Sequence, residues 1–134
     1  MSASPAPVTL ITGASRGLGR SAATHLARAG HDLILTYHRQ TGAAEAVAAE
    51  LRGLGRRVAV LPLDVGEAGG FPAFAAQVRE VLAGWGLARF DHLVNNAGTG
   101  LHVPFAETTA EQLDAMYRIH FKGPYLLTQA LLPL

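Results

Sequence analysis

The chain has 134 residues, no cysteine, 49% hydrophobic residues and a formal net charge of +1. This length and composition indicate one compact domain with a substantial core, and they exclude a disordered chain, disulfide frameworks, thiolate metal sites and cysteine nucleophiles. The near-neutral charge argues against a nucleic-acid partner, and no apolar run reaches the roughly 18–20 residues that span a bilayer.

Residues 1–7, MSASPAP, have neither a basic start nor an apolar stretch, so they do not resemble a secretory signal. We expect them to form a disordered leader ahead of a single domain over residues 8–134. A cytoplasmic location is the default expectation for such a chain.

The first half of the chain alternates between strand-like and helix-like patterns. Val8–Thr12 is an apolar run typical of a strand that is buried on both faces. Residues 17–29 predict a helix that ends at Gly30, since glycine is common just after a helix. Asp32–Tyr37 predicts a second strand, and the alanine-rich residues 43–51 predict a second helix. The apolar stripe of the first helix is expected to consist of Leu18, Ala22, Leu26 and Ala29.

The second half continues this alternation. Arg57–Leu63 predicts a third strand, and Pro62, which has no N–H to donate, suits a strand at the edge of a sheet. Apolar residues at helical spacing predict a third helix over residues 71–85, and Phe90–Val94 predicts a fourth strand.

The last helix has its own start signal. Thr108 and Glu111 have the spacing of a capping box, so we expect a helix to begin there. Gly123-Pro124 is expected to bend or interrupt it before a second apolar stretch, Tyr125–Leu132. Its inward stripe is expected to include Leu113, Met116, Tyr117 and His120.

Strands and helices thus alternate along the whole chain. Such alternation indicates an α/β fold, a doubly wound parallel sheet with right-handed crossovers and helices on both faces. Numbered along the chain, the strands are expected in the order 3-2-1-4.

A glycine-rich turn, TGASRGLG, follows the first strand over residues 12–19. Gly13 suits a sharp turn, Gly17 lets a backbone approach a ligand, and Gly19 lets the next helix pack closely on the sheet. The N–H groups at the start of that helix would then point at the turn and bind a pyrophosphate. The alternative is a tight turn without a ligand, but the position between a strand and a helix favours a phosphate site.

This turn resembles the TGxxxGxG nucleotide motif of the short-chain dehydrogenase/reductase family. Asn95–Gly98, after the fourth strand, is similar to the family's NNAG motif, and Asp64-Val65, after the third, to its adenine-contacting pair. The three motifs occur in the family's order, and they look most like those of 3-oxoacyl-carrier-protein reductases and similar ketoreductases. The resemblance implies a Rossmann-like fold and hydride transfer between a nicotinamide and a carbonyl or alcohol substrate.

Carried over position by position, the motifs predict three parts of a cofactor site. The glycine-rich turn would line the pyrophosphate and the adenosine ribose, Asp64-Val65 would hold the adenine edge, and Asn95, Ala97 and Gly98 would border the riboses. Asn95 is also expected to tie neighbouring strands together; without the other motifs, Asn95-Asn96 would indicate only a polar turn. The predicted cofactor-binding residues are Thr12, Gly13, Ser15, Arg16, Gly17, Leu18, Gly19, Tyr37, Arg39, Asp64, Val65, Asn95, Ala97 and Gly98.

The residues after the second strand predict NADP(H) rather than NAD(H). A carboxylate about twenty residues past the glycine-rich turn would bind the 2′-hydroxyl of NAD, yet no acidic residue lies between Asp32 and Glu45. Arg39 after the strand and Arg16 in the turn instead resemble the family's basic residues for the 2′-phosphate of NADP. The planar guanidinium matches phosphate oxygens. The alternative for Arg39 is an ordinary solvated charge.

The family's chemistry implies a relay of Asn, Ser, Tyr and Lys, in which a Lys four residues after the Tyr lowers the pKa of its hydroxyl. This chain has one lysine, Lys122, and no Tyr-x-x-x-Lys. His120 stands where the family usually has the Asn, and an imidazole there is able to orient a water. The alternative is a buried histidine bonded to a carbonyl. The other five histidines show no metal-ligand spacing, so no metal site is expected.

Family members are much longer than this chain. We therefore expect it to be the N-terminal part of a reductase, incomplete at its C-terminus, with the catalytic Ser and Tyr-Lys pair beyond it and the fourth strand an exposed edge. The alternative is a catalytically inactive NADP(H)-binding protein. The expected partners are a small carbonyl or alcohol substrate and further copies of the chain in a homodimer or tetramer, with no nucleic acid or membrane.

Overall fold

The computed structural model describes residues 4–134. Part of the expected leader, residues 1–3, lies outside the described residues, and residues 4–7 have no regular structure. Strands alternate with helices from Val8 onward, as the sequence predicts, and the bounds agree within about two residues for most elements. The elements are β1 (Val8–Ile11), α1 (Gly17–Arg28), β2 (Asp32–Tyr37), α2 (Thr41–Gly53), β3 (Val58–Pro62), the 3-10 turn η1 (Ala68–Gly70), α3 (Phe71–Gly84), β4 (His92–Val94), the 3-10 turn η2 (Phe105–Glu107), α4 (Ala110–Tyr117), the π-helical turn η3 (Arg118–Lys122) and α5 (Gly123–Leu131).

The four strands form one parallel sheet in the order β3-β2-β1-β4. This confirms the predicted α/β fold and its strand order. Pro62 pairs with Tyr37 at the end of β3, and β3 is an edge strand, so the missing N–H of Pro62 faces no neighbouring strand. All four strands run in the same direction, so their carboxyl ends meet at one edge of the sheet.

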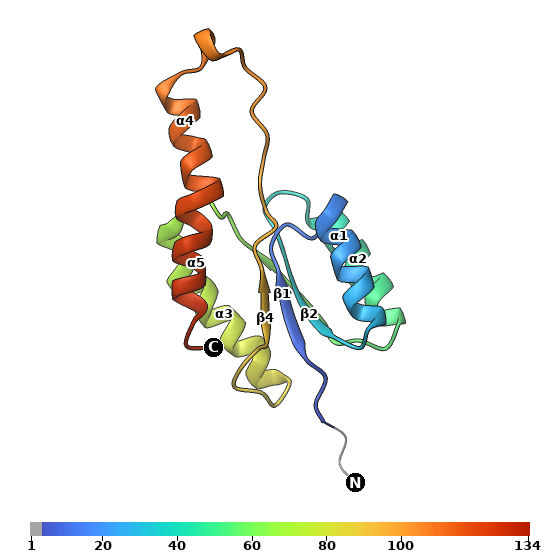
Figure 1. Cartoon of the computed structure of the whole chain (residues 1–134). Helices are drawn as coiled ribbons and strands as arrows, with labels where there is room; N and C mark the ends of the chain where they lie inside the picture. The colour runs from blue at the N-terminus through green and yellow to red at the C-terminus, as the bar shows by residue number, and fades with distance from the viewer. Residues whose placement is uncertain (1–3) are drawn as a thin grey trace.

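Helices cover both faces of the sheet: α1 and α2 lie on one face, and α3 and α5 on the other (Figure 1). Because successive side chains of a strand point to opposite faces of the sheet, each buried strand contributes side chains to two cores, one on each face. Leu10 and Ile34 belong to the core under α3 and α5. Ile11 and Leu33 belong to the core under α1 and α2. The buried central strands explain why Val8–Ile11 and Asp32–Tyr37 are continuously apolar rather than alternating.

The stripe predicted for α1 is partly wrong. Its buried residues are Gly19, Ala23 and Ala27, whereas Leu18 is 83% exposed. Small residues face the sheet because α1 lies close to the turn after β1. The buried face of α1 therefore lies one position along the sequence from the predicted stripe. The predicted C-terminus is confirmed, since Gly30 has a φ of +97° and its N–H donates to the Ala27 carbonyl.

The start of α4 lies one residue later than predicted. Thr109 rather than Thr108 is the N-cap: its hydroxyl accepts from the Gln112 N–H, and the Gln112 side chain accepts from the Thr109 N–H. Thr108 ends the preceding turn, and its hydroxyl donates to the Pro104 carbonyl. The two adjacent threonines, each with an acidic or amide residue three positions on, made the register ambiguous.

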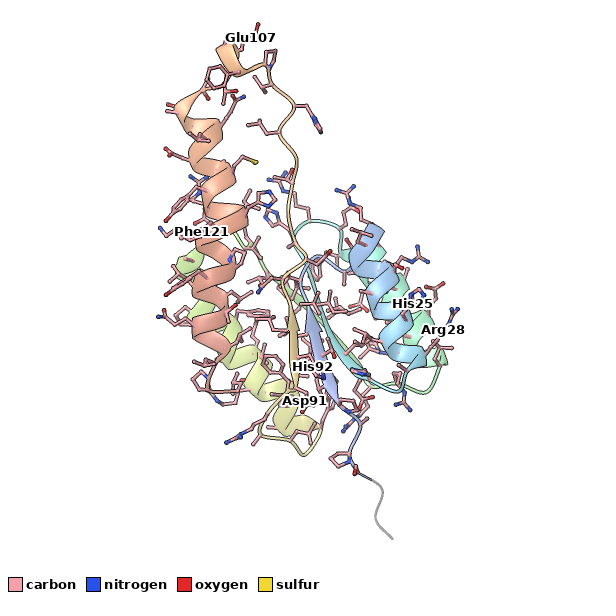
Figure 2. All side chains as sticks on the ribbon, viewed as in Figure 1. His25, Arg28, Asp91, His92, Glu107 and Phe121 are labelled. Atoms are coloured by element: carbon pink, nitrogen blue, oxygen red, sulfur yellow. The ribbon has the colours of Figure 1, made fainter. Side chains whose placement is uncertain are left out.

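The inward stripe predicted for α4 is also wrong. Leu113 is 64% and Tyr117 is 54% exposed, and His120 is exposed as well, although Met116 is half-buried. The reason is position, because α4 extends past the carboxyl end of the sheet (Figure 1). Figure 2 shows the neighbouring Phe121 on the outer side of the helix. An amphipathic pattern shows only which face is apolar, not whether another element covers it.

The predicted interruption of this helix is present as the π-helical turn Arg118–Lys122. Pro124 follows it and has no N–H for the backbone ladder. At Gly123 a Cβ would collide with the Val65 carbonyl oxygen and lie 2.8 Å from the Arg118 carbonyl oxygen. Gly123 thus lets the start of α5 pack directly on the loop that follows β3, and this fixes η3 above that loop.

Candidate functional site

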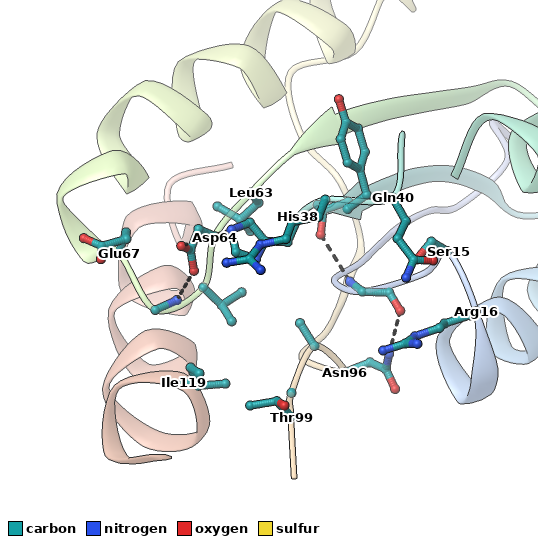
Figure 3. Close-up of a pocket in the computed structure, with 18 of the residues that line it drawn as sticks. Ser15, Arg16, His38, Gln40, Leu63, Asp64, Glu67, Asn96, Thr99 and Ile119 are labelled. Carbon is teal, nitrogen blue, oxygen red and sulfur yellow. Dashed lines mark hydrogen bonds and ion pairs between the residues drawn. The ribbon is translucent and has the colours of Figure 1, made fainter. Parts of the chain in front are cut away.

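The loops that follow the four strands surround one cavity of about 670 Å³ at the carboxyl edge of the sheet (Figure 3). This volume lies within the range of small-molecule and cofactor sites, roughly 300–1,000 Å³. In doubly wound sheets ligands bind at this edge, at the point where the strand order reverses. Here the reversal lies between β1 and β4.

The structure brings ten of the fourteen predicted cofactor residues to the wall of this cavity and leaves Thr12, Leu18, Gly19 and Asn95 outside it; His120, the predicted relay residue, also lies outside the wall. Leu18 points into solvent, whereas Thr12 and Gly19 are buried directly beneath the turn. The ten residues at the wall are Gly13, Ser15, Arg16, Gly17, Tyr37, Arg39, Asp64, Val65, Ala97 and Gly98.

The turn after β1 has the geometry that its glycines predict. Gly13 has a φ of +68° and Gly17 a φ of +59°, conformations that other residues rarely adopt. No atom lies within 4 Å of a Cβ added at Gly17, so a ligand has room there. At Gly19, a Cβ would collide with the Gly13 carbonyl oxygen and lie 2.5 Å from Asn96 Nδ2. Gly19 therefore permits the close packing of α1 on the turn.

The N-terminus of α1 is suited to an anion. Arg16 is its N-cap, and within residues 4–134 no side chain caps the helix and no acidic residue lies in its first turn. The first N–H groups of a helix lack intrahelical partners and carry partial positive charge. Together with the open space at Gly17, this end of α1 fits a pyrophosphate group.

Asn96 holds the glycine-rich turn in place, and it is this residue rather than Asn95 that ties β1 to β4. Asn96 Nδ2 donates to the carbonyl oxygens of Thr12 (3.1 Å) and Gly13 (3.0 Å), and so it joins β1 to the end of β4. The buried Thr12 hydroxyl accepts from the N–H groups of Asn96 and Ala97, each at 3.0 Å. Asn95 instead donates to the Thr128 hydroxyl on α5 at 3.2 Å. Successive side chains of extended backbone point in opposite directions, so only one of the two asparagines reaches the turn.

The residues after β2 form the second wall of the cavity. The Thr36 hydroxyl accepts from the Gly13 N–H at 3.2 Å, which ties this wall to the glycine-rich turn. Arg16 and Arg39 both line the cavity, and neither forms an ion pair within the described part of the chain. Asp32 lies at the opposite end of β2, where it is bound by Arg57, so no carboxylate of β2 faces the cavity.

The residues after β3 form the third wall. The Asp64 carboxylate accepts from the Gly66 N–H at 2.9 Å through Oδ1, and its Oδ2 lies 3.3 Å from His38 Nε2. Figure 3 shows His38 beside Asp64, with Ile119 of η3 facing the same space. Hydrophobic Leu63, Val65 and Ile119 with a polar Asp64 suit an adenine, which has apolar faces and a polar edge.

Sequence reasoning missed half of the lining residues. The missed residues that follow β2 and β3 are neighbours in the sequence of predicted cofactor residues, so the positions of the strand ends could have indicated them. Arg118 and Ile119 come from η3, at least twenty residues past the last motif, and no sequence pattern shows that this turn lies over the cavity. The missed residues are Thr36, His38, Gln40, Leu63, Gly66, Glu67, Asn96, Thr99, Arg118 and Ile119.

His120 contacts a backbone carbonyl, as expected for the alternative of a buried histidine, but its side chain is exposed. Its Nε2 lies 2.7 Å from the Thr99 carbonyl oxygen, so this nitrogen is the donor, and its Cε1 lies 2.7 Å from where a Cβ of Gly98 would be. In the neutral imidazole Nδ1 is then an acceptor. The imidazole thus packs on the NNAG segment beside the cavity.

Of the remaining histidines, His31 and His92 lie beside each other, with ring centroids 5.6 Å apart. His25 lies on the outer side of α1, and His92 lies at the start of β4 (Figure 2). Across residues 4–134, no group of three or more His, Asp or Glu side chains is placed to bind a metal ion. None of the described helices is both long and apolar enough to cross a membrane.

Comparison with known proteins matches residues 7–134 to the short chain dehydrogenase family. Tetrahydroxynaphthalene reductase from Pestalotiopsis fici is 32% identical over 123 residues, which are 91% of this chain and 42% of that protein. A short-chain dehydrogenase from Burkholderia cenocepacia, solved in complex with NADP, is 30% identical with a TM-score of 0.84 over 94% of this chain and 49% of that one. A 3-oxoacyl-[acyl-carrier protein] reductase from Brucella melitensis, solved in complex with NAD, is 33% identical with a TM-score of 0.84 over 97% and 49%.

The chain spans about half the length of these relatives. The match covers every element from β1 to α5 and all three motifs of the cavity. The chain therefore belongs to the short-chain dehydrogenase/reductase family.

Proposed function

We propose that this chain binds NADP(H) and forms the cofactor-binding half of a reductase that transfers hydride between the nicotinamide and a carbonyl or alcohol carbon. The observation that carries the proposal is the uncapped N-terminus of α1 facing open space at Gly17, within a cavity of about 670 Å³. The turn would bind the pyrophosphate through its N–H groups. Asp64 and Val65 would border the adenine, and Ala97 and Gly98 the riboses.

The choice of NADP(H) over NAD(H) depends on charge. Arg16 and Arg39 line the cavity without an acidic partner among residues 4–134, and no carboxylate of β2 faces the cavity. A guanidinium bound to a phosphate contributes roughly 1.5–3 kcal/mol, about tenfold or more in affinity. The Burkholderia cenocepacia relative was solved with NADP and the Brucella melitensis relative with NAD, so the choice depends on the charges of this chain's own residues.

The nicotinamide, when bound, supplies the hydride. In this chain Arg118 and Thr99 also line the cavity, together with Arg16 and Arg39. His120 would hold a water through Nδ1, because its Nε2 is engaged by the Thr99 carbonyl. The family's Tyr-Lys pair, in which the tyrosine hydroxyl protonates the substrate, has no counterpart in these 134 residues, since Lys122 is the only lysine and no tyrosine precedes it by four positions.

A second candidate is a catalytically inactive NADP(H)-binding protein, which applies where the natural gene product also lacks the Tyr-Lys pair. The decisive first experiment is a fluorescence titration with NADPH beside an NADPH-oxidation assay with a panel of ketones. We expect binding without turnover by these residues; no binding would contradict both candidates. The mass of the natural gene product separates them: a mass well above 14.1 kDa supports the reductase, and a mass of 14.1 kDa supports the inactive binder.

We also propose that the protein forms homo-oligomers through the outer face of α4, η3 and α5. Tyr117, Phe121 and Tyr125 stack on one another along this face, with ring centroids 5.7 and 6.4 Å apart, and all three are more than half exposed. Contiguous apolar surface of this kind marks an interaction site. Analytical ultracentrifugation would show self-association, and a monomer at all concentrations would contradict it.

A further inference from the structure

We propose that Arg52 and Pro62 together prevent β3 from pairing with β3 of a second copy of the chain. β3 is an edge strand, and in the doubly wound order any further strands add beside β4, so this edge stays open in a longer chain as well. Its sequence, VAVLP, has no charged side chain and carries two valines, which favour strands. Such an edge is a template for strand addition unless the fold protects it.

The hydrogen bonds to β2 show which backbone groups of β3 face outward. The Arg57 carbonyl accepts from the Leu33 N–H, and the Leu63 N–H donates to the Tyr37 carbonyl, each at 2.9 Å. Because backbone groups alternate in direction along a strand, the odd-numbered residues from 57 to 63 face β2 and the even-numbered residues face solvent. The outward residues are Val58, Val60 and Pro62.

Arg52, in the last turn of α2, occupies the outward carbonyl of Val58. Its Nη2 donates to that oxygen at 2.8 Å and its Nε at 3.2 Å. A carbonyl oxygen has two lone pairs, so both acceptor positions are taken. The remaining nitrogen, Nη1, lies 3.8 Å from Glu45 Oε2, which helps to hold the guanidinium against the strand edge. An N–H that approaches this carbonyl would therefore meet the guanidinium in its place.

Pro62 removes the donor that this carbonyl would need. The two-fold antiparallel register that uses all the outward residues places Val60 opposite Val60, and Val58 of one copy opposite residue 62 of the other. The Val58 carbonyl would then accept from the N–H of residue 62 in the second copy. Proline has no N–H, and Arg52 already fills the carbonyl, so the two residues block opposite ends of the same hydrogen bond. The two-fold axis repeats this bond, so the pair of strands loses it twice.

Removing one of the two blocks does not restore the bond. In Arg52→Ala the carbonyl is free but still faces a proline, and in Pro62→Val the new N–H still faces an occupied carbonyl. Only the double variant forms both symmetric bonds, which strengthens association about tenfold or more. If Arg52 only stabilised the end of β3, its effect would not depend on the residue at position 62.

The test is the exchange rate of the Val60 amide hydrogen, measured by NMR at a low and a high concentration of the folded 134-residue chain. This N–H faces solvent in a single copy and is hydrogen-bonded in a β3 pair, so the readout is specific to this edge. For the double variant we expect exchange to be about tenfold slower at the high concentration. In the wild type and in each single variant, the rate should not depend on concentration.

The matched control is Arg56→Ala combined with Pro62→Val. Arg56 also donates to a backbone carbonyl, that of Gly30 at 2.7 Å, but this carbonyl does not belong to β3. The control should therefore behave like Pro62→Val alone. Slow exchange of Val60 in the control, equal to that in the double variant, would show a general effect of lost arginine contacts and overturn the proposal.

Two further results would also overturn it. One is a double variant whose Val60 amide exchanges at the same rate at both concentrations. The other is protection in Arg52→Ala alone that equals protection in the double variant, since it would not depend on an N–H at position 62. Arg52→Ser with Pro62→Thr opens the same two groups and replaces the first pair if circular dichroism shows that pair to be unfolded. No cofactor is used, so a failure of NADPH binding leaves this test intact.

Discussion

Gly19→Ala is the substitution that tests the packing of the turn most sharply. The new Cβ would collide with the Gly13 carbonyl oxygen, lie 2.5 Å from Asn96 Nδ2 and lie 3.0 Å from the Ala14 Cα. Overpacking of this kind costs about 1–3 kcal/mol. Displacement of Asn96 adds about 1 kcal/mol for each of its two hydrogen bonds. The higher helix propensity of alanine offsets about 1 kcal/mol.

The net expectation is a loss of about 2–4 kcal/mol in the free energy of unfolding, or roughly 4 °C in Tm for each kcal/mol in a domain of this size. Gly42→Ala is the matched control, because it also lies in a helix but has no atom within 4 Å of the added Cβ. It should stabilise the chain by up to about 1 kcal/mol. Thermal unfolding followed by circular dichroism measures both variants, and an NADPH titration should show weaker binding for Gly19→Ala alone. Equal Tm values for the two variants would refute the packing argument.

Three further substitutions test other parts of the account. Arg39→Asp should weaken NADP binding far more than NAD binding, about tenfold or more, and equal losses in titrations of both would show that Arg39 is a solvated charge. Asn96→Ala should lower the unfolding free energy by about 1–3 kcal/mol because it removes two bonds to the turn, whereas Asn95→Ala removes one exposed bond; chemical denaturation that ranks them the other way would contradict the placement of Asn96. Phe121→Ser should reduce self-association in sedimentation velocity without lowering Tm, and an unchanged sedimentation profile would exclude this face as the interface.

The strands and their order could be predicted because burial on both faces of a parallel sheet leaves a strong local signal. Val8–Ile11 and Asp32–Tyr37 are continuously apolar apart from threonine and the paired Asp32, and few other elements produce such runs. The orientation of α4 could not be predicted in this way. The sequence pattern shows which face of α4 is apolar, but whether Leu113 packs against another element depends on where the helix lies relative to the sheet.

In the site, too, residues with a local sequence signal could be predicted, and residues that only the fold brings together could not. The glycine-rich turn was predictable because positive φ angles and close contacts leave glycine as the only suitable residue at Gly13 and Gly19. The contact between His38 and Asp64 joins residues 26 positions apart, one after β2 and one after β3, and neither residue type signals the other. Ile119 reaches the cavity only because η3 packs against the loop after β3 through Gly123.

The central claim is that the N-terminus of α1 binds the pyrophosphate of NADP(H), and amide chemical shifts measured during a titration with NADP⁺ test it directly. The account predicts that the N–H signals of Gly17, Leu18 and Gly19 shift strongly and saturate together, while those at the far end of α1, such as Arg28, stay in place. Saturable binding that leaves the three turn signals unmoved, or no binding at millimolar NADP⁺, would contradict it.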